Sequence, residues 1–172
     1  MTRRTNARIA GITFLLYIAA GLSSMALRGR APATEVLPLI TSFCALVLGV
    51  TLYAITREED RDLALLALVC RVVESIPGNR AEVFFAAGST IFCWLLLSGR
   101  MIPAALAWLG VASSAMLLFI LLLQRGGLFG GVLGWSSSIT WVIWMPMLVF
   151  ELALAGWLIV KGVAPRPERQ PA

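Results

Sequence analysis

The chain has 172 residues, of which 59% are hydrophobic and 13% are charged, and its formal net charge is +5. Soluble domains are roughly 45–50% apolar and about 25% charged, so this composition excludes a soluble globule and predicts an integral membrane protein. The basic residues stand singly or in pairs between apolar runs, which indicates membrane topology and argues against a nucleic-acid partner. We therefore expect an all-α, multi-pass bundle. In a bacterial cell such a bundle would lie in the inner membrane, because outer-membrane proteins are barrels.

The sequence contains no histidine, and its three cysteines, Cys44, Cys70 and Cys93, each lie inside an apolar run. Histidine is the commonest metal ligand and the commonest general base near neutral pH. The chain also has no GxSxG motif that would place a nucleophilic serine. An enzyme is therefore the least favoured functional class. We expect no catalytic residue, no metal and no cofactor, with the cysteines as buried reduced thiols.

The sequence predicts six helical spans, at residues 9–27, 37–56, 62–77, 81–98, 101–124 and 137–160. Arg3, Arg4 and Arg8 precede the first span, which resembles a signal peptide. However, its apolar run is longer than the usual signal-peptide core of about 7–15 residues, so we interpret it as a retained signal anchor. Residues 1–163 would form a single bundle, and residues 164–172 a proline-rich disordered tail.

The third predicted helix is ambiguous because it is short. Only residues 63–77 separate the charged segment REEDRD, at 57–62, from a proline-glycine turn. Fifteen helical residues would cover about 22 Å, less than the roughly 30 Å of a hydrocarbon core. The helix would either span with help from its capped start or lie at the interface. Asp60 or Asp62 is expected to provide that N-terminal cap.

At helical spacing, the third helix has two different faces. A small and charged face is expected to look into the bundle, and it comprises Ala64, Ala67, Leu68, Arg71, Glu74 and Ser75. An aliphatic face is expected to look toward lipid, and it comprises Leu65, Leu66, Val69, Val72 and Val73.

The positive-inside rule favours six spans with both termini in the cytoplasm. In this layout the cytoplasmic side carries Arg3, Arg4, Arg8, Arg57, Arg61, Arg100, Lys161, Arg166 and Arg169. The opposite side carries only Arg28, Arg30, Arg80 and Arg125, while Arg71 is intramembrane. If the third helix did not cross, the tail would move outside and the two sides would carry nearly equal numbers of basic residues.

The last span contains Glu151 near its middle, where a carboxyl group is costly to bury and needs a partner or a purpose. Pro146 removes the backbone hydrogen bond to Val142, so we expect a helix kink just before this charge. The kink and the carboxyl group would then belong to one local feature of the last helix.

The third helix supplies candidate partners for that carboxyl group. Arg71 and Glu74 are three residues apart, close enough to pair along a helix, and Glu151 could reach Arg71 across the bundle. We predict a buried polar network of these three residues. Its expected polar neighbours are Thr13, Tyr17 and Ser89.

Four stretches of the chain carry a resemblance to a known family: ARIAGITFLLYIAAG, REEDRDLALLALVCRVVES, SGRMIPAALAWLGV and FELALAGWLIVKGV. In this order they resemble the bacterial membrane proteins of the domain of unknown function 4386 family. The positions that lift the resemblance above general hydrophobicity are charged: Arg71, Glu74, Glu151 and Lys161. Members look longer between the third and fourth helices. The family has no established activity, so the resemblance implies a membrane architecture and no mechanism.

Two functional classes remain beside the enzyme. In the first, the protein binds or helps move a lipid or small amphiphile, and Glu151 belongs to a polar binding site or a proton-linked gate. This class predicts a polar cavity facing one leaflet or the midplane. In the second, the protein is a structural or partner-binding membrane subunit, and the buried charges act only as an interhelical lock. Membrane lipids are expected partners in both, with an oligomer or protein partner in the second.

Overall fold

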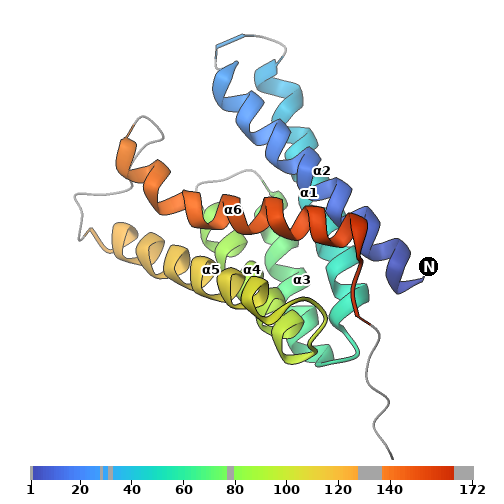
Figure 1. The fold of residues 1–172 in the computed structure, drawn as a ribbon. Helices are drawn as coiled ribbons and strands as arrows, with labels where there is room; N and C mark the ends of the chain where they lie inside the picture. The colour runs from blue at the N-terminus through green and yellow to red at the C-terminus, as the bar shows by residue number, and fades with distance from the viewer. Residues whose placement is uncertain (1, 28, 31–32, 77–79, 128–136, 165–172) are drawn as a thin grey trace, which may run out of the picture.

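The computed structural model describes residues 2–27, 29–30, 33–76, 80–127 and 137–164. The described residues form six helices and no strand, which confirms the predicted all-α class (Figure 1). The helices are α1 (Arg3–Ala26), α2 (Ala33–Thr56), α3 (Arg61–Ser75), α4 (Ala81–Ser98), α5 (Ala104–Arg125) and α6 (Ser138–Val160). The predicted disordered tail lies outside the described residues, except for Ala164.

Helix α4 has the predicted bounds, whereas α1 and α2 begin earlier than predicted. The predicted starts followed the apolar runs, but a helix continues into polar flanks as long as its backbone is capped. Thr2 provides such a cap for α1, because its side chain accepts a hydrogen bond from the Thr5 amide over 3.2 Å. The basic residues Arg3, Arg4 and Arg8 are therefore part of α1 itself.

Five of the six described helices are long and apolar enough to cross a membrane: α1, α2, α4, α5 and α6. The protein is therefore a multi-pass helical membrane protein. Helix α3 has 15 residues and is the exception. Asp60 caps its start as predicted, because the Asp60 carboxylate accepts hydrogen bonds of 3.0 Å from the amides of Asp62 and Leu63.

Contacts at the helix ends show how the chain passes back and forth (Figure 1). At one end, Arg3 at the start of α1 donates a hydrogen bond of 3.1 Å to the carbonyl of Ile55 and lies 3.5 Å from the sulfur of Met101. At the other end, Arg125 of α5 lies 3.8 Å from Glu82 at the start of α4. Helix α3 therefore connects the two ends of the bundle. That it crosses the membrane as a sixth span stays a prediction. The orientation in the membrane stays a prediction.

Glycines allow α3 to lie close to both of its neighbours. A Cβ atom on Gly49 of α2 would lie 2.9 Å from the Arg71 Cβ, and one on Gly88 of α4 would lie 3.0 Å from the Cys70 Cβ. Small residues of this kind let membrane helices approach closely, which packing in lipid requires. The short helix thus packs closely against both α2 and α4.

The two predicted faces of α3 are confirmed except at Leu68, Val73 and Ser75, which are half-buried. Its buried residues are Ala64, Ala67, Cys70, Arg71 and Glu74, and its exposed aliphatic residues include Leu65, Leu66, Val69 and Val72. Cys70 joins the buried face in addition to the residues predicted there. All three cysteines are buried and free, as expected.

Candidate functional site

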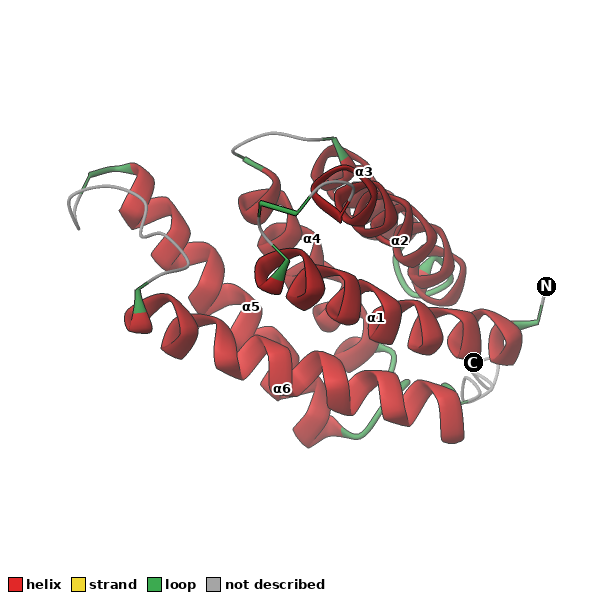
Figure 2. Cartoon of the chain, turned by 90° about the horizontal axis from the view of Figure 1, so that it is seen from above, coloured by secondary structure: helices red, strands yellow, loops and turns green. Residues whose placement is uncertain are grey.

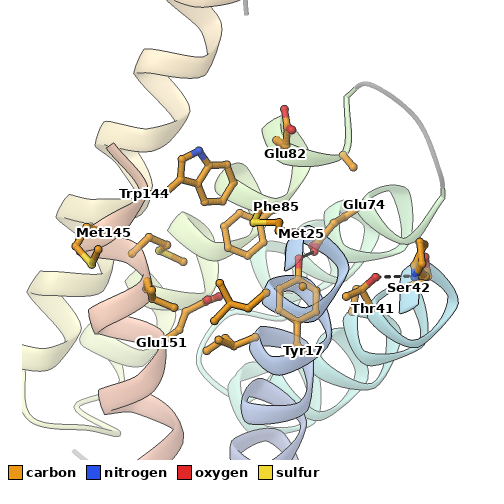
Figure 3. A pocket seen from close by; sticks show the side chains of 18 of the residues that line it. Tyr17, Met25, Thr41, Ser42, Glu74, Glu82, Phe85, Trp144, Met145 and Glu151 are labelled. Carbon is orange, nitrogen blue, oxygen red and sulfur yellow. Dashed lines mark hydrogen bonds between the residues drawn. The ribbon is translucent and has the colours of Figure 1, made fainter. Parts of the chain in front are cut away.

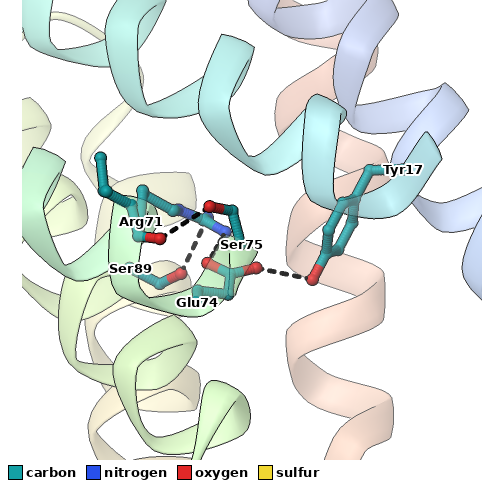
Figure 4. Close-up of polar contacts among 6 residues, drawn as sticks. Tyr17, Arg71, Glu74, Ser75 and Ser89 are labelled. Carbon is teal, nitrogen blue, oxygen red and sulfur yellow. Dashed lines mark hydrogen bonds and ion pairs between the residues drawn. The ribbon is translucent and has the colours of Figure 1, made fainter. Parts of the chain in front are cut away.

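A cluster of polar side chains joins α1, α3 and α4 (Figure 4). Arg71 is 1% exposed, and its guanidinium donates to the Glu74 carboxylate over 2.8 Å and to the Ser89 hydroxyl over 3.1 Å. The Tyr17 hydroxyl donates to the other carboxylate oxygen of Glu74 over 2.7 Å. Two of the three predicted neighbours, Tyr17 and Ser89, are therefore direct partners. The third, Thr13, is buried on α1 one turn before Tyr17.

Aromatic rings extend this polar cluster toward α6. The Arg71 guanidinium carbon lies 4.9 Å from the ring centroid of Phe85, close enough for a cation–π contact. Phe85 stacks on Tyr17, with centroids 6.3 Å apart, and on Trp144 of α6, with centroids 5.7 Å apart. The stack Tyr17, Phe85 and Trp144 connects three helices beside the ion pair. Sequence spacing gave no signal for it, because the rings come from distant segments.

Glu151 is buried on α6, with 5% of its surface exposed, but it does not pair with Arg71. The ion pair expected between Arg71 and Glu151 is not formed: Arg71 bonds to Glu74 on its own helix and to Ser89, and its Nε atom has no hydrogen-bond partner in the described part of the chain. Among the described residues, the Glu151 Oε1 atom has no hydrogen-bond partner. The three predicted network residues are thus all buried, but only two of them bond to each other.

The Glu151 carboxyl group lies on the wall of a cavity of about 390 Å³ (Figure 3). Its lining residues come from α1, α2, α4 and α6 and from the C-terminal end of α3. Most of the wall is aliphatic, aromatic or methionine, and three carboxyl groups interrupt it: Glu74, Glu82 and Glu151. The cavity is therefore mainly apolar, and the carboxyl groups are its charged exceptions.

The cavity lies where α1 and α6 diverge (Figures 1 and 2). These two helices touch at Gly11, where an added Cβ would lie 2.8 Å from the carbonyl oxygen of Ala155. Further along α1, Gly21 lines the cavity, and an added Cβ there would meet nothing within 4 Å. Close packing at one end of α1 thus gives way to open space at the other.

Pro146 lies inside α6, which remains helical on both sides of it. The residues after and before it, Met147 and Met145, both line the cavity. The proline is thus placed in the part of α6 that forms the cavity wall. The expected kink at Pro146 stays a prediction.

The described residues contain no group of three or more histidine, cysteine, aspartate or glutamate side chains that could hold a metal ion. The cavity has carboxyl groups, but the thiol of Cys93 and the other two thiols do not line it. The arrangement is that of a recess able to take a molecule with both apolar and polar parts.

Comparison with known families matches residues 79–162 to a family described as domain of unknown function DUF4386. The matched range runs from just before α4 to just after α6, so it contains Glu151 and Lys161, whereas Arg71 and Glu74 precede it. No curated protein and no solved structure matches the chain. The resemblance seen in the sequence is confirmed over this range: residues 79–162 match the DUF4386 family model, within a multi-pass helical membrane protein.

Proposed function

We propose that the protein binds a small amphiphile, or the polar part of a lipid, in the cavity between α1 and α6. The observation that carries this proposal is the cavity itself, about 390 Å³ in volume, with the unpartnered carboxyl oxygen of Glu151 on its wall. Ligand pockets are typically about 300–1,000 Å³, mostly apolar, with few polar groups. A cavity near the lower end of this range suits a small or single-chain molecule.

The position of the cavity supports access from the membrane. Its walls include the halves of α1 and α6 that diverge, and both helices are long and apolar enough to span a bilayer. Exposed apolar side chains follow the outer surfaces of both helices, among them Leu16 and Val142. A molecule dissolved in the membrane could therefore reach the cavity sideways without crossing water. Movement of a lipid between leaflets would build on such binding.

The alternative is a structural or partner-binding subunit, and the polar cluster favours it. Both terminal nitrogens of Arg71 are bonded, and both carboxylate oxygens of Glu74 are bonded, so the cluster holds α1, α3 and α4 together without any ligand. The cluster acts as an interhelical lock in either case. The two functions differ in whether the adjacent cavity takes up a molecule.

Photolabelling tests the proposal directly. The full chain is placed in phosphatidylglycerol nanodiscs with dodecyl probes that carry a photoreactive diazirine on the chain and a hydroxyl, trimethylammonium or carboxylate head. After irradiation, mass spectrometry of peptides locates each adduct. We expect at least one probe to label cavity-lining segments of α1 and α6. We expect Gly21→Trp, which fills the cavity, to reduce this labelling by about tenfold, equivalent to roughly 1.4 kcal/mol of binding free energy.

Gly156→Trp is the matched control. Gly156 also has open space beside its backbone, since an added Cβ would meet nothing within 4 Å, but it lies on the exposed face of α6 outside the cavity. This variant should label like the parent. If no probe labels the cavity, or if both tryptophan variants label equally, the binding proposal is wrong and the structural role is favoured.

A further inference from the structure

We infer that the cavity selects amphiphiles whose head carries a positive charge, such as an alkylammonium group, and that Glu151 is the residue that recognises this head. The inference rests on the proposed function, because it specifies the ligand class of the same cavity. Two observations support the inference: which charged side chains line the cavity, and which of its carboxyl groups have a hydrogen-bond or ion-pair partner.

The carboxyl groups of the cavity differ in whether they have a partner. Glu74 is neutralised by Arg71 at 2.8 Å, and Glu82 lies 3.8 Å from Arg125. Glu151 has no ion pair among the described residues, and its Oε1 atom has no hydrogen-bond partner. Glu151 is therefore the carboxyl group of the wall that still requires a partner, and a buried carboxylate without one is unfavourable.

The wall contains no lysine or arginine side chain among the residues that line the cavity. An anionic head would therefore approach several carboxyl groups without a cation to hold it. A neutral head could donate one hydrogen bond to Glu151 but would do little to stabilise the ionised form of this buried carboxyl group. A cationic head does both, because an ammonium group is attracted to the carboxylate and can lie against it.

The aromatic residues of the wall fit the same class of head. Trp144, Phe85 and Tyr17 line the cavity and stack on one another. The faces of such rings attract cations, and aromatic cages recognise quaternary ammonium groups in this way. Phe85 already holds one cation, since the Arg71 guanidinium lies 4.9 Å from its centroid. Trp144 and Tyr17 extend this cation-attracting surface along the cavity wall.

Figure 3 shows how these groups are arranged. The Glu151 carboxyl group points from α6 toward the space between α6 and α1, with Trp144 and Phe85 along one side and Tyr17 across from it. A head at Glu151 would leave its chain to follow the apolar residues of α1 and α6, including Ile18 and Leu148. One site thus offers a negative anchor, aromatic faces and an apolar path.

The probe series described above separates this inference from binding itself. In the unsubstituted protein we expect the trimethylammonium probe to label the cavity about tenfold more than the hydroxyl probe at equal concentration, and the carboxylate probe least. Glu151→Gln keeps the shape of the side chain but removes its charge, so it should abolish the preference for the ammonium head. Labelling by the hydroxyl probe should change little.

Glu35→Gln is the charge-matched control. Glu35 is exposed at the start of α2, at the same end of the bundle as the cavity, but Glu35 does not line the cavity. The anionic membrane concentrates the cationic probe to the same extent around Glu151→Gln and Glu35→Gln. A difference in probe preference between these two variants therefore reports on the cavity and not on the membrane. Glu35→Gln should keep the full preference.

Three results overturn the inference. Equal labelling by the ammonium and hydroxyl probes, with both blocked by Gly21→Trp, would leave amphiphile binding intact but remove its charge selectivity. A preference that survives Glu151→Gln would show that another group recognises the head. Absence of any cavity labelling would instead overturn the proposed function together with the inference.

Discussion

The hydroxyl of Tyr17 donates a hydrogen bond of 2.7 Å to the carboxylate of Glu74, and this bond ties α1 to α3 at the edge of the cavity. The other oxygen of the same carboxylate holds Arg71, which in turn reaches Ser89 on α4. One carboxylate therefore connects three helices, and its loss should affect both the fold and the shape of the cavity.

Removing the Glu74 carboxylate should destabilise the protein strongly. Glu74→Ala leaves the Arg71 guanidinium, 1% exposed, without its counter-charge, and breaking a buried pair in this way costs about 3–5 kcal/mol. Replacing both partners, by Arg71→Met with Glu74→Leu, should recover most of this loss because no unpaired charge remains. Equilibrium unfolding in mixed micelles measures the free energy of unfolding for each variant.

Val72→Ala provides a control for that series, because Val72 is exposed on the lipid-facing side of the same helix. It should change the free energy of unfolding much less than Glu74→Ala. If Glu74→Ala and Val72→Ala were equally mild, the Arg71–Glu74 pair would not stabilise the bundle.

The hydrogen bond between Tyr17 and Glu74 should contribute a smaller amount. Tyr17→Phe removes only the hydroxyl, and interhelical hydrogen bonds in membranes average about 0.6 kcal/mol, with a maximum near 1.7 kcal/mol. A double-mutant cycle of Tyr17→Phe and Glu74→Ala, each of which removes the bond, should therefore give a coupling energy of this size. A coupling energy of zero would mean that the bond does not join α1 to α3 energetically.

Adding a single methyl group at Gly11 should separate α1 from α6. The Cβ of Gly11→Ala would lie 2.8 Å from the carbonyl oxygen of Ala155, and this backbone atom cannot rotate away. Overpacking of this kind costs about 1–3 kcal/mol, measurable as a lower thermal midpoint in detergent. Gly156→Ala, whose Cβ meets nothing within 4 Å, should leave the midpoint unchanged or raise it slightly, because alanine favours a helix more than glycine does. A Gly11→Ala variant as stable as the Gly156→Ala variant would argue against this close contact.

Cysteine labelling should show that α3 crosses the membrane. Glu58→Cys precedes α3 and Arg80→Cys follows it, and both positions are exposed. Because α3 runs between opposite ends of the bundle, a membrane-impermeant maleimide should reach Glu58→Cys only from the cytoplasmic side and Arg80→Cys only from the other side. The native cysteines are buried and give little background. Labelling of both positions from one side would exclude a crossing by α3.

The N-terminal cap of α3 should be measurable by substitution of Asp60. The Asp60 carboxylate accepts hydrogen bonds from two backbone amides that have no partner within the helix. Asp60→Ala should cost about 1 kcal/mol of unfolding free energy, within the usual range for caps. Asp60→Asn keeps an oxygen that can accept the same bonds and should retain most of the stability. Equal losses in both variants would contradict a hydrogen-bonding role.

The faces of α3 were predictable because they depend on helical periodicity alone. A residue such as Arg71 is too costly to expose to lipid, so the spacing of small and charged residues indicates which side must be buried. The cap at Asp60 was predictable for a similar reason, since the last acidic residues before an apolar run suit a helix start. Both features depend on interactions within a few residues of one another.

The partner of Glu151 was not predictable in this way. The sequence places Arg71 and Glu151 on different helices, but the distance between them depends on how α3 and α6 are arranged in the bundle. Gly11 brings α1 against α6 at one end, and the two helices diverge toward the other. The cavity produced there separates Glu151 from the ion pair that was expected to include it.

Composition, hydrophobic run lengths and local spacing determined the membrane class, the six helices and the burial of Arg71, Glu74 and Glu151, because each follows from the cost of exposing polar groups to lipid. Only the tertiary structure decided which of these groups bond to each other. Helix packing brings Tyr17 and Ser89 to the Arg71–Glu74 pair, and it leaves Glu151 facing a cavity. Such contacts between distant segments depend on the angles and distances between helices, which no local pattern contains.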